Sequence, residues 1–234
     1  MSSPENTATR SAHTGTIQSR LVGVAAIAFT ALWVAENVLF AVTGALPYDA
    51  PIDEVEAYYA ANRGAIAIVS GLVALYLPLL LVFVTGLHGL VERRGGAGAD
   101  WSRLALAAGA VASAVFVLFN VLQVGLALSA DEFAEPTPAF EFVWQMHASA
   151  FGLLLPMLGT LCIGATIAAR ASGLTPNWQR LLGLVGGSLL LAAGLGNLTI
   201  AGGSALIFVG LLGFAVWLVW LSTTGVRLIR SQPQ

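Results

Sequence analysis

Long apolar runs separated by short polar gaps occupy most of the sequence. A helix needs about 20 predominantly apolar residues to cross a lipid bilayer. Six runs are about that long, over residues 21–46, 64–91, 104–128, 142–169, 181–200 and 204–226. They are continuous and lack the alternation of apolar and polar residues that is typical of membrane-spanning strands. The pattern therefore predicts an all-α, polytopic membrane protein, a bundle of six transmembrane helices.

The polar gaps are too short to hold a separate domain outside the membrane. Residues 1–19 are rich in Ser and Thr and have no apolar period, so we expect a disordered cytoplasmic tail. Residues 20–228 then form the six-helix transmembrane domain, and residues 229–234 form a short cytoplasmic tail. In residues 51–63, apolar and acidic residues recur at helical spacing. This predicts a short outer interfacial helix with its tyrosines in the aromatic belt of the membrane.

The composition agrees with a protein whose solvent is lipid. Hydrophobic residues make up 57% of the chain and charged residues 9%, with a mean hydropathy of +0.84, whereas soluble domains carry about 25% charged residues. Nine of the ten arginines lie before the first run, after the last run or in alternate gaps between runs. Arg63 lies in the other set of gaps, where the acidic residues gather. Because arginine is retained on the cytoplasmic side, both termini are predicted to be cytoplasmic.

The chain lacks residues that several membrane functions need. It contains no lysine, which excludes a retinal Schiff base and a pyridoxal phosphate linkage. Its single cysteine, Cys162, lies deep in a run and is expected to be a small core residue, with no disulfide and no CxxC site. His13, His88 and His147 are too far apart for two of them to hold a haem, and no zinc-binding spacing is present. We therefore expect no cofactor and no bound metal.

Glu36 is the strongest candidate for a functional residue, because it is the only carboxylate well inside a predicted span. It lies about 16 residues beyond Arg20, roughly 24 Å along a helix, which puts it in the outer half of the bilayer. An acidic side chain at that depth normally faces the bundle interior and finds a partner. Five polar residues of other spans lie at a similar depth: Asn120, Gln123, Gln145, His147 and Asn197. Together with Glu36 they predict an outward-facing, ligand-binding polar pocket.

The same residues have simpler explanations, which the sequence leaves open. Buried amides also form interhelical hydrogen bonds, worth about 0.6 kcal/mol each on average, so the amides of this set could act only in packing. His147 lies near the outer boundary beside aromatic residues and could be an interfacial residue. His88, near the cytoplasmic end of the second span, is expected to pair with Glu92 or to cap its helix.

Three stretches carry a resemblance to a known family. They are EVEAYYAANRG before the second span, MHASAFGLLLPMLGTLCIG in the fourth span, and RASGLTPNWQRLLGLVGGSLLLAAGLGN after it. In order and spacing they resemble a bacterial, actinobacterial-like family of six-helix integral membrane proteins known only as a domain of unknown function. The resemblance implies a fold and no activity. A multi-pass protein of this kind is expected in the bacterial plasma (inner) membrane.

Two functional hypotheses follow from these observations. In the first, the protein binds or moves a small molecule or proton via an outward-facing intramembrane polar pocket around Glu36. In the second, it is a non-enzymatic membrane scaffold or regulatory partner whose polar residues only fix helix packing. An enzyme is disfavoured, because the sequence offers no paired acid and base and no metal site. The expected partners are the lipid bilayer, the small-molecule or proton ligand, and either a second copy of the chain or another membrane protein; no nucleic acid is expected.

Overall fold

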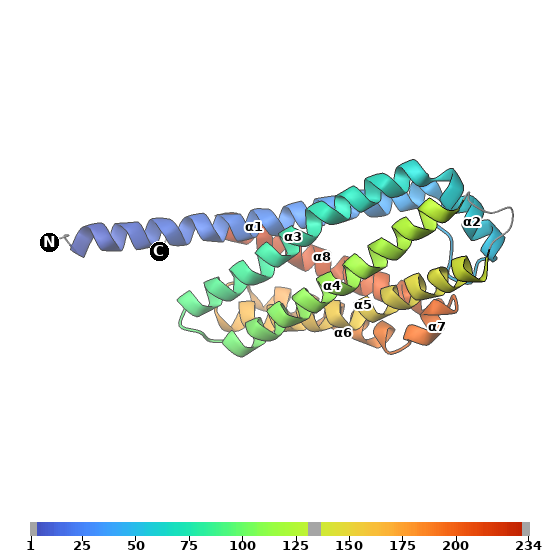
Figure 1. The fold of residues 1–234 in the computed structure, drawn as a ribbon. Coiled ribbons are helices and arrows are strands. Elements are labelled where there is room, and N and C mark those ends of the chain that lie inside the picture. Colours follow the sequence, from blue (N-terminus) through green and yellow to red (C-terminus); the bar gives the residue numbers. More distant parts are fainter. Residues whose placement is uncertain (1–3, 131–136, 231–234) are drawn as a thin grey trace.

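The computed structural model describes residues 4–130 and 137–230, with side chains described from Ile17 onward. Helices make up most of this part of the chain (Figure 1). They are α1 (Pro4–Thr43), α2 (Ile52–Ala61), α3 (Arg63–Arg93), α4 (Ala99–Ser129), α5 (Pro138–Ala171), α6 (Asn177–Gly194), α7 (Asn197–Ala201) and α8 (Leu206–Arg230). Residues 131–136, between α4 and α5, and residues 231–234, the end of the predicted C-terminal tail, lie outside the described residues.

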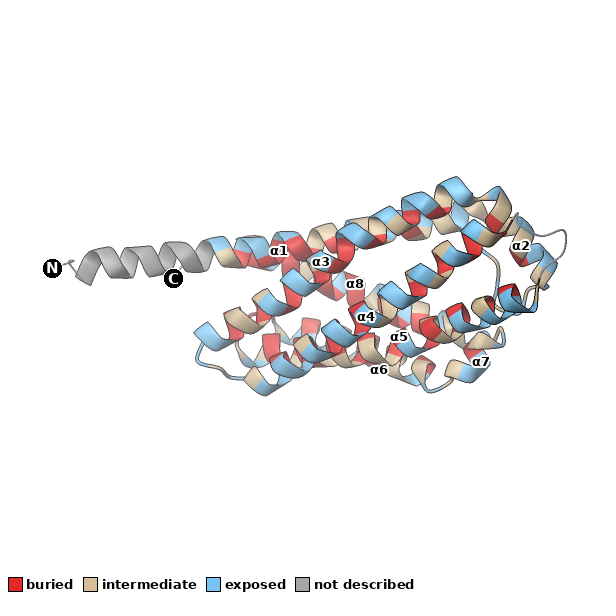
Figure 2. Cartoon of the chain, in the orientation of Figure 1, coloured by how far each residue is buried: buried red, intermediate tan, exposed pale blue. Residues whose placement is uncertain are grey.

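The long helices form a closed ring in chain order. The helices α1, α3, α4, α5, α6 and α8 each pack against the next, and α8 packs against α1. The short helices α2 and α7 lie at the end of the bundle opposite the chain termini (Figure 1). Side chains on the inward helix faces are buried, whereas outward faces are exposed (Figure 2).

Five of the described helices are long and apolar enough to cross a membrane: α3, α4, α5, α8 and the Ile17–Thr43 part of α1. Large apolar side chains cover their outward faces, such as Leu75, Val121 and Leu153, each more than half exposed. Contiguous apolar surface of this extent is unfavourable in water and needs a partner or lipid to cover it. The chain is therefore a helical, multi-pass membrane protein.

The fifth predicted span, residues 181–200, is interrupted. It is divided between α6 and α7, with Leu195 and Gly196 between them. Gly194 and Gly196 flank this break, and glycine disfavours a helix by about 1 kcal/mol relative to alanine. The helix α6 also begins with the polar residues Asn177, Gln179 and Arg180, which lower its apolar character. It nevertheless packs between α5 and α8 like the other members of the ring.

Helix α1 begins well before the first apolar run. It starts at Pro4 and covers most of residues 1–19, for which the sequence predicted a disordered tail. Figure 1 shows this part of α1 extending beyond the bundle. Proline suits the first helical turn, because its missing N–H has no intrahelical partner there. The next proline is Pro47, so no proline interrupts the helix in between.

Glycine pairs hold α6 close to both neighbours. A Cβ atom added at Gly159 on α5 would lie 2.8 Å from the carbonyl oxygen of Gly187 on α6. A Cβ atom added at Gly186 would lie 2.8 Å from the carbonyl oxygen of Gly213 on α8. Small residues permit such close backbone approach in membranes. Gly186 and Gly187 of α6 therefore serve contacts within the chain.

The short helix predicted before the second span is present as α2, and it closes one end of the bundle. Val55 and Tyr59 are buried in an apolar cluster that includes Leu126 of α4 and Trp144 of α5. The sequence placed the tyrosines of this helix in the aromatic belt, but Tyr59 packs inward instead. Arg63 fixes this end of the bundle as well, since its Nε donates to the carbonyl oxygen of Ala127 at 2.8 Å.

Candidate functional site

The side chain of Glu36 points into the bundle. Val22, Phe29 and Glu36 are seven residues apart, so they share one face of α1. Their exposed fractions are 1%, 2% and 2%. The face that buries the apolar side chains of α1 against α3 and α8 therefore also buries the carboxyl group.

Glu36 lines a cavity of about 230 Å³ at the α2 end of the bundle. Its walls come from α1, α2, α4, α5, α8 and the loop after α1. The lining extends to Ala45, an exposed residue of that loop. A smaller apolar cavity of about 40 Å³ shares Trp33, Phe116 and Leu211 with it. The larger cavity thus continues inward as apolar space.

Three helices contribute to the cavity by the same pattern. Each provides two aromatic residues and one polar residue, at positions i, i+3 and i+7 of a helix face. The triplets are Trp33, Glu36 and Phe40 on α1; Phe116, Phe119 and Gln123 on α4; and Trp144, His147 and Phe151 on α5. The cavity is therefore lined mainly by aromatic side chains, together with a carboxyl, an amide and an imidazole group.

Several polar atoms of the cavity have no hydrogen-bond partner among the described residues. They include Glu36 Oε2, Gln123 Oε1 and both ring nitrogens of His147. All three side chains are buried, with exposed fractions of 5% or less. Most buried polar groups in proteins are hydrogen-bonded, and an unpartnered one is costly. These three side chains therefore line the cavity with polar atoms that no described residue satisfies.

Tyr76 on α3 is a further polar residue close to Glu36. Its hydroxyl group lies near the Glu36 carboxyl group, but Tyr76 Oη also has no hydrogen-bond partner among the described residues. Tyr76 lines the smaller cavity and packs edge to face on Phe116, with ring centroids 5.7 Å apart. Tyr76 was not among the site residues predicted from the sequence. A tyrosine in the middle of an apolar run was the available signal.

The structure brings three of the six predicted site residues together, Glu36, Gln123 and His147, and keeps the other three out of this cavity. Asn120 donates from Nδ2 to Ser70 Oγ on α3 at 3.1 Å. Gln145 is exposed and donates to Glu141 on its own helix at 3.2 Å. Asn197 begins α7, and its Oδ1 lies where a Cβ atom on Gly152 of α5 would be.

Helical phase explains this division. Successive residues are rotated by about 100° around an α-helix. Gln145 and His147 are two residues apart and therefore lie on nearly opposite faces of α5. Asn120 and Gln123 differ by about 60°, enough to turn Asn120 toward α3. The prediction rested on similar depth along the bundle, and depth alone does not decide which neighbour a side chain faces.

Three tyrosines, Tyr48, Tyr58 and Tyr59, line the α2 end of the cavity. Tyr58 Oη lies 3.0 Å from Thr43 Oγ1, which joins α2 to the end of α1. Trp144 Nε1 donates to the carbonyl oxygen of Tyr48 at 3.2 Å, which joins the loop to α5. Burial, with a smaller effect of the neighbouring Tyr59, raises the pKa of Tyr48 well above its usual value. Burial, followed by the effect of Tyr58, likewise raises the pKa of Tyr59. Both hydroxyl groups therefore stay neutral near pH 7.

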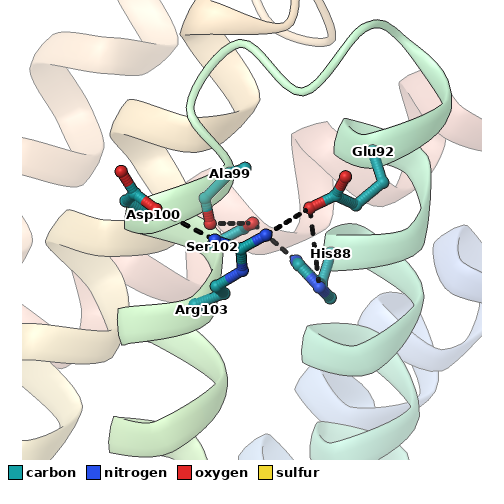
Figure 3. Close-up of polar contacts among 6 residues, drawn as sticks. All are labelled: His88, Glu92, Ala99, Asp100, Ser102 and Arg103. Carbon is teal, nitrogen blue, oxygen red and sulfur yellow. Dashed lines mark hydrogen bonds and ion pairs between the residues drawn. The ribbon is translucent and has the colours of Figure 1, made fainter.

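A second polar cluster joins α3 to α4 at the opposite end of the bundle (Figure 3). His88 Nδ1 lies 2.8 Å from Ser102 Oγ, and Ser102 Oγ donates to the carbonyl oxygen of Ala99 at 2.8 Å. Because the hydroxyl proton is used on Ala99, Ser102 must accept a hydrogen bond from His88 Nδ1–H. Ser102 is also 1% exposed. This arrangement fixes two helices and does not activate the serine as a nucleophile.

The predicted pairing of His88 with Glu92 is present as a long contact. His88 Nε2 lies 3.9 Å from Glu92 Oε1, whereas Arg103 approaches the same carboxylate at 3.1 Å. Arg103 also contacts Asp100 at 3.1 Å (Figure 3). These side chains are largely exposed, and such surface ion pairs contribute about 0–1 kcal/mol each. The cluster therefore has a structural role.

Within residues 17–130 and 137–230, no three His, Cys, Asp or Glu side chains come together as a possible metal site. Comparisons of the chain with protein-family models, with curated proteins and with solved structures give no match. The resemblance noted in the sequence stays a prediction.

Proposed function

We propose that this integral membrane protein binds or moves a small molecule or proton through the cavity around Glu36. One observation carries the proposal: three residues with unpartnered buried polar atoms, one each on α1, α4 and α5, line a single cavity of about 230 Å³. Residues that serve only packing form bonds to a neighbouring helix, as Asn120 does with Ser70. Glu36 Oε2, Gln123 Oε1 and the ring nitrogens of His147 have no bond to a described residue, and their side chains line the cavity instead.

The proposal includes an orientation in the membrane. The chain crosses six times, with α6 and α7 together forming the fifth crossing, since 18 helical residues extend about 27 Å. The end of the bundle that carries nine arginines faces the cytoplasm, which puts both termini there. The cavity then opens at the outer face. The resemblance to a bacterial family supports the bacterial plasma membrane as the location.

A cysteine on the cavity wall tests whether small molecules reach this space. Leu211 lines the cavity, whereas its neighbour Leu212 is 58% exposed on the outward face of α8. Native Cys162 is fully buried and serves as an unreactive background. In reconstituted vesicles, we expect methyl methanethiosulfonate, a small neutral thiol reagent, to modify Leu211→Cys at least about tenfold faster than Leu212→Cys. Equal, slow rates would contradict a reachable cavity.

Glu36→Gln tests the role of the carboxyl group, with Gln145→Leu as the matched control because Gln145 lies outside this cavity and, among the described residues, bonds to Glu141 on its own helix. Proton entry into vesicles is followed with an internal pH-sensitive dye under an inward proton gradient. A loss of entry in Glu36→Gln but not in Gln145→Leu supports movement of protons or of a proton-coupled molecule. Unchanged entry together with a reachable cavity supports binding. Unchanged entry and an unreachable cavity contradict both.

A scaffold or regulatory partner is the second candidate, and particular contacts favour it. Besides the Asn120–Ser70 bond, Gln179 Nε2 donates to Thr223 Oγ1 at 2.8 Å between α6 and α8. Such bonds fix helix register without a ligand. This function predicts that Glu36→Gln leaves every transport and accessibility measurement unchanged and that one protein copurifies with the chain in constant ratio.

A further inference from the structure

Resting on the proposed function, we infer that the Glu36 cavity takes a small organic cation, a quaternary or protonated tertiary ammonium group of about the size of choline. The inference rests on the lining of the cavity, the charge around its outer end and its volume. Each of these observations is independent of the others.

The lining suits a cation. Nine aromatic side chains line the cavity, and among the described lining residues Glu36 is the only one with a carboxyl group. They are Trp33, Phe40, Tyr48, Tyr58, Tyr59, Phe116, Phe119, Trp144 and Phe151. Aromatic faces attract ammonium groups, most strongly where water is excluded. On α1 itself, Trp33 and Phe40 lie one turn before and one turn after Glu36, so the carboxyl group is flanked by rings on its own helix face.

The surface at the same end of the bundle is acidic. Five described acidic residues lie there: Asp49, Asp53, Glu54, Glu56 and Glu141. Arg63 is the one described arginine at this end, and its guanidinium group donates to the carbonyl oxygens of Ala127 and Leu128 at the C-terminus of α4. A surface of one sign attracts ligands of the opposite sign and raises their rate of association. The outer end thus concentrates cations beside the cavity.

The volume sets the size of the ligand. Drug-sized ligands occupy pockets of about 300–1,000 Å³, and this cavity is smaller, at about 230 Å³. At about 30 Å³ per water-sized group, it holds about seven such groups. Choline has that many non-hydrogen atoms. Tetramethylammonium and small protonated amines also fit.

Other ligand classes match the cavity less well. An anion would meet a carboxyl group with no described lysine or arginine on the cavity wall. A divalent metal ion needs about six or more oxygen ligands, and the wall offers one carboxylate, Glu36, with the amide groups of Asn37 and Gln123. A fully apolar molecule would leave Glu36 Oε2 buried and unpartnered. An ammonium group satisfies the carboxylate and the aromatic faces together.

Choline and its neutral isostere 3,3-dimethyl-1-butanol test the charge requirement without any substitution. Binding of each to the purified full-length protein in lipid nanodiscs is measured by isothermal titration calorimetry. We expect choline to bind at least about tenfold more tightly than the alcohol, the effect of a desolvated cation–π and ion-pair contact. Glu36→Gln should remove most of this preference and leave the affinity for the alcohol unchanged. Equal affinities in the wild-type protein, or no binding of choline, would overturn the inference.

The cysteine of Leu211→Cys gives a second test that separates this inference from the proposed function. We expect 2-(trimethylammonium)ethyl methanethiosulfonate to react at least about tenfold faster than the anionic 2-sulfonatoethyl reagent, and Glu36→Gln to reduce the ratio. The reaction with the neutral reagent reports only whether the cavity is reachable. If the neutral reagent reacts but the two charged reagents react at equal rates, the inference that the cavity binds a cation is wrong. The proposed function is not affected by that result. If Leu211→Cys does not fold, Ile207→Cys on the same cavity wall replaces it in this test. Phe208→Cys, on the outward face of α8, is then the control.

Discussion

The imidazole ring of His147 on α5 lies stacked on the phenyl ring of Phe119 on α4, with ring centroids 4.0 Å apart and planes inclined by 25°. Trp144 lies nearly parallel to the same imidazole, at 5.3 Å and 15°. His147 therefore packs as a flat ring between aromatic neighbours, while its two nitrogens have no partner among the described residues.

This stacking predicts different results for two substitutions. His147→Phe preserves the ring and removes unpartnered nitrogens, so the free energy of unfolding should change by less than about 1 kcal/mol. His147→Ala removes the ring from a buried site and should cost about 3 kcal/mol, as for other buried rings. Unfolding in mixed micelles with increasing sodium dodecyl sulfate measures both. A large loss of stability in His147→Phe would show that the nitrogens are bonded in the folded protein.

Asn120 and Gln123 lie on the same helix and should behave oppositely. Asn120 bonds to Ser70 on α3, so a double-mutant cycle with Asn120→Leu and Ser70→Ala should give a coupling of about 0.6 kcal/mol. Gln123→Leu removes a buried oxygen that has no described partner, and should leave stability unchanged within about 0.5 kcal/mol. A coupling energy near zero between Asn120 and Ser70 would mean that Asn120 does not stabilise helix packing. A large loss of stability in Gln123→Leu would mean that Gln123 does.

The position of α6 in the ring depends on its glycines. Gly159→Ala places a methyl group 2.8 Å from the carbonyl oxygen of Gly187, and relieving that overlap should cost about 1–3 kcal/mol. Gly71→Ala is the matched control, because nothing lies within 4 Å of its added Cβ atom. It should be neutral or slightly stabilising, since alanine favours a helix. Equal effects of the two substitutions would mean that α5 and α6 do not pack as described.

The apolar runs predicted most of the helices, because burial of apolar surface and backbone hydrogen bonding in lipid leave few alternatives to a spanning helix. They did not predict the break at Gly196, since leucines on both sides continue the apolar run. The apolar runs also did not predict which neighbouring helix each polar side chain faces. In water an apolar stripe identifies the inward face, whereas in lipid both faces are apolar, so Asn120 and Gln145 could not be assigned to a neighbour.

Part of the missing information was nevertheless present in the sequence. Aromatic residues recur with Glu36, Gln123 and His147 at the same i, i+3, i+7 spacing on three helices. Gln145 and Asn197 lack that companion pattern, and the structure places them outside the cavity. A shared spacing is therefore a better guide to a common cavity than similar depth.

Burial of Tyr59 predicts a loss of stability in alkali. Burial raises the pKa of Tyr59 above the usual value of 10.0, so the folded protein keeps the phenol neutral while the unfolded chain ionises near pH 10. The stabilising contribution is complete below about pH 10 and falls as pH rises further, by up to about 1.4 kcal/mol per pH unit. Between about pH 10 and 11, the free energy of unfolding of Tyr59→Phe should fall less steeply with pH than that of the wild-type protein. Parallel pH profiles would show that Tyr59 is accessible to water.

A crystal structure of the protein in a lipidic phase containing tetramethylarsonium tests the central claim most directly, because arsenic identifies the cation by its anomalous signal. We predict an anomalous peak inside the cavity, beside the Glu36 carboxyl group and among the rings of Trp33 and Phe119, and its loss in crystals of Glu36→Gln. Density for another bound molecule there would support the site but not the cation. A cavity filled by its own side chains, with Glu36 turned toward lipid, would contradict the account.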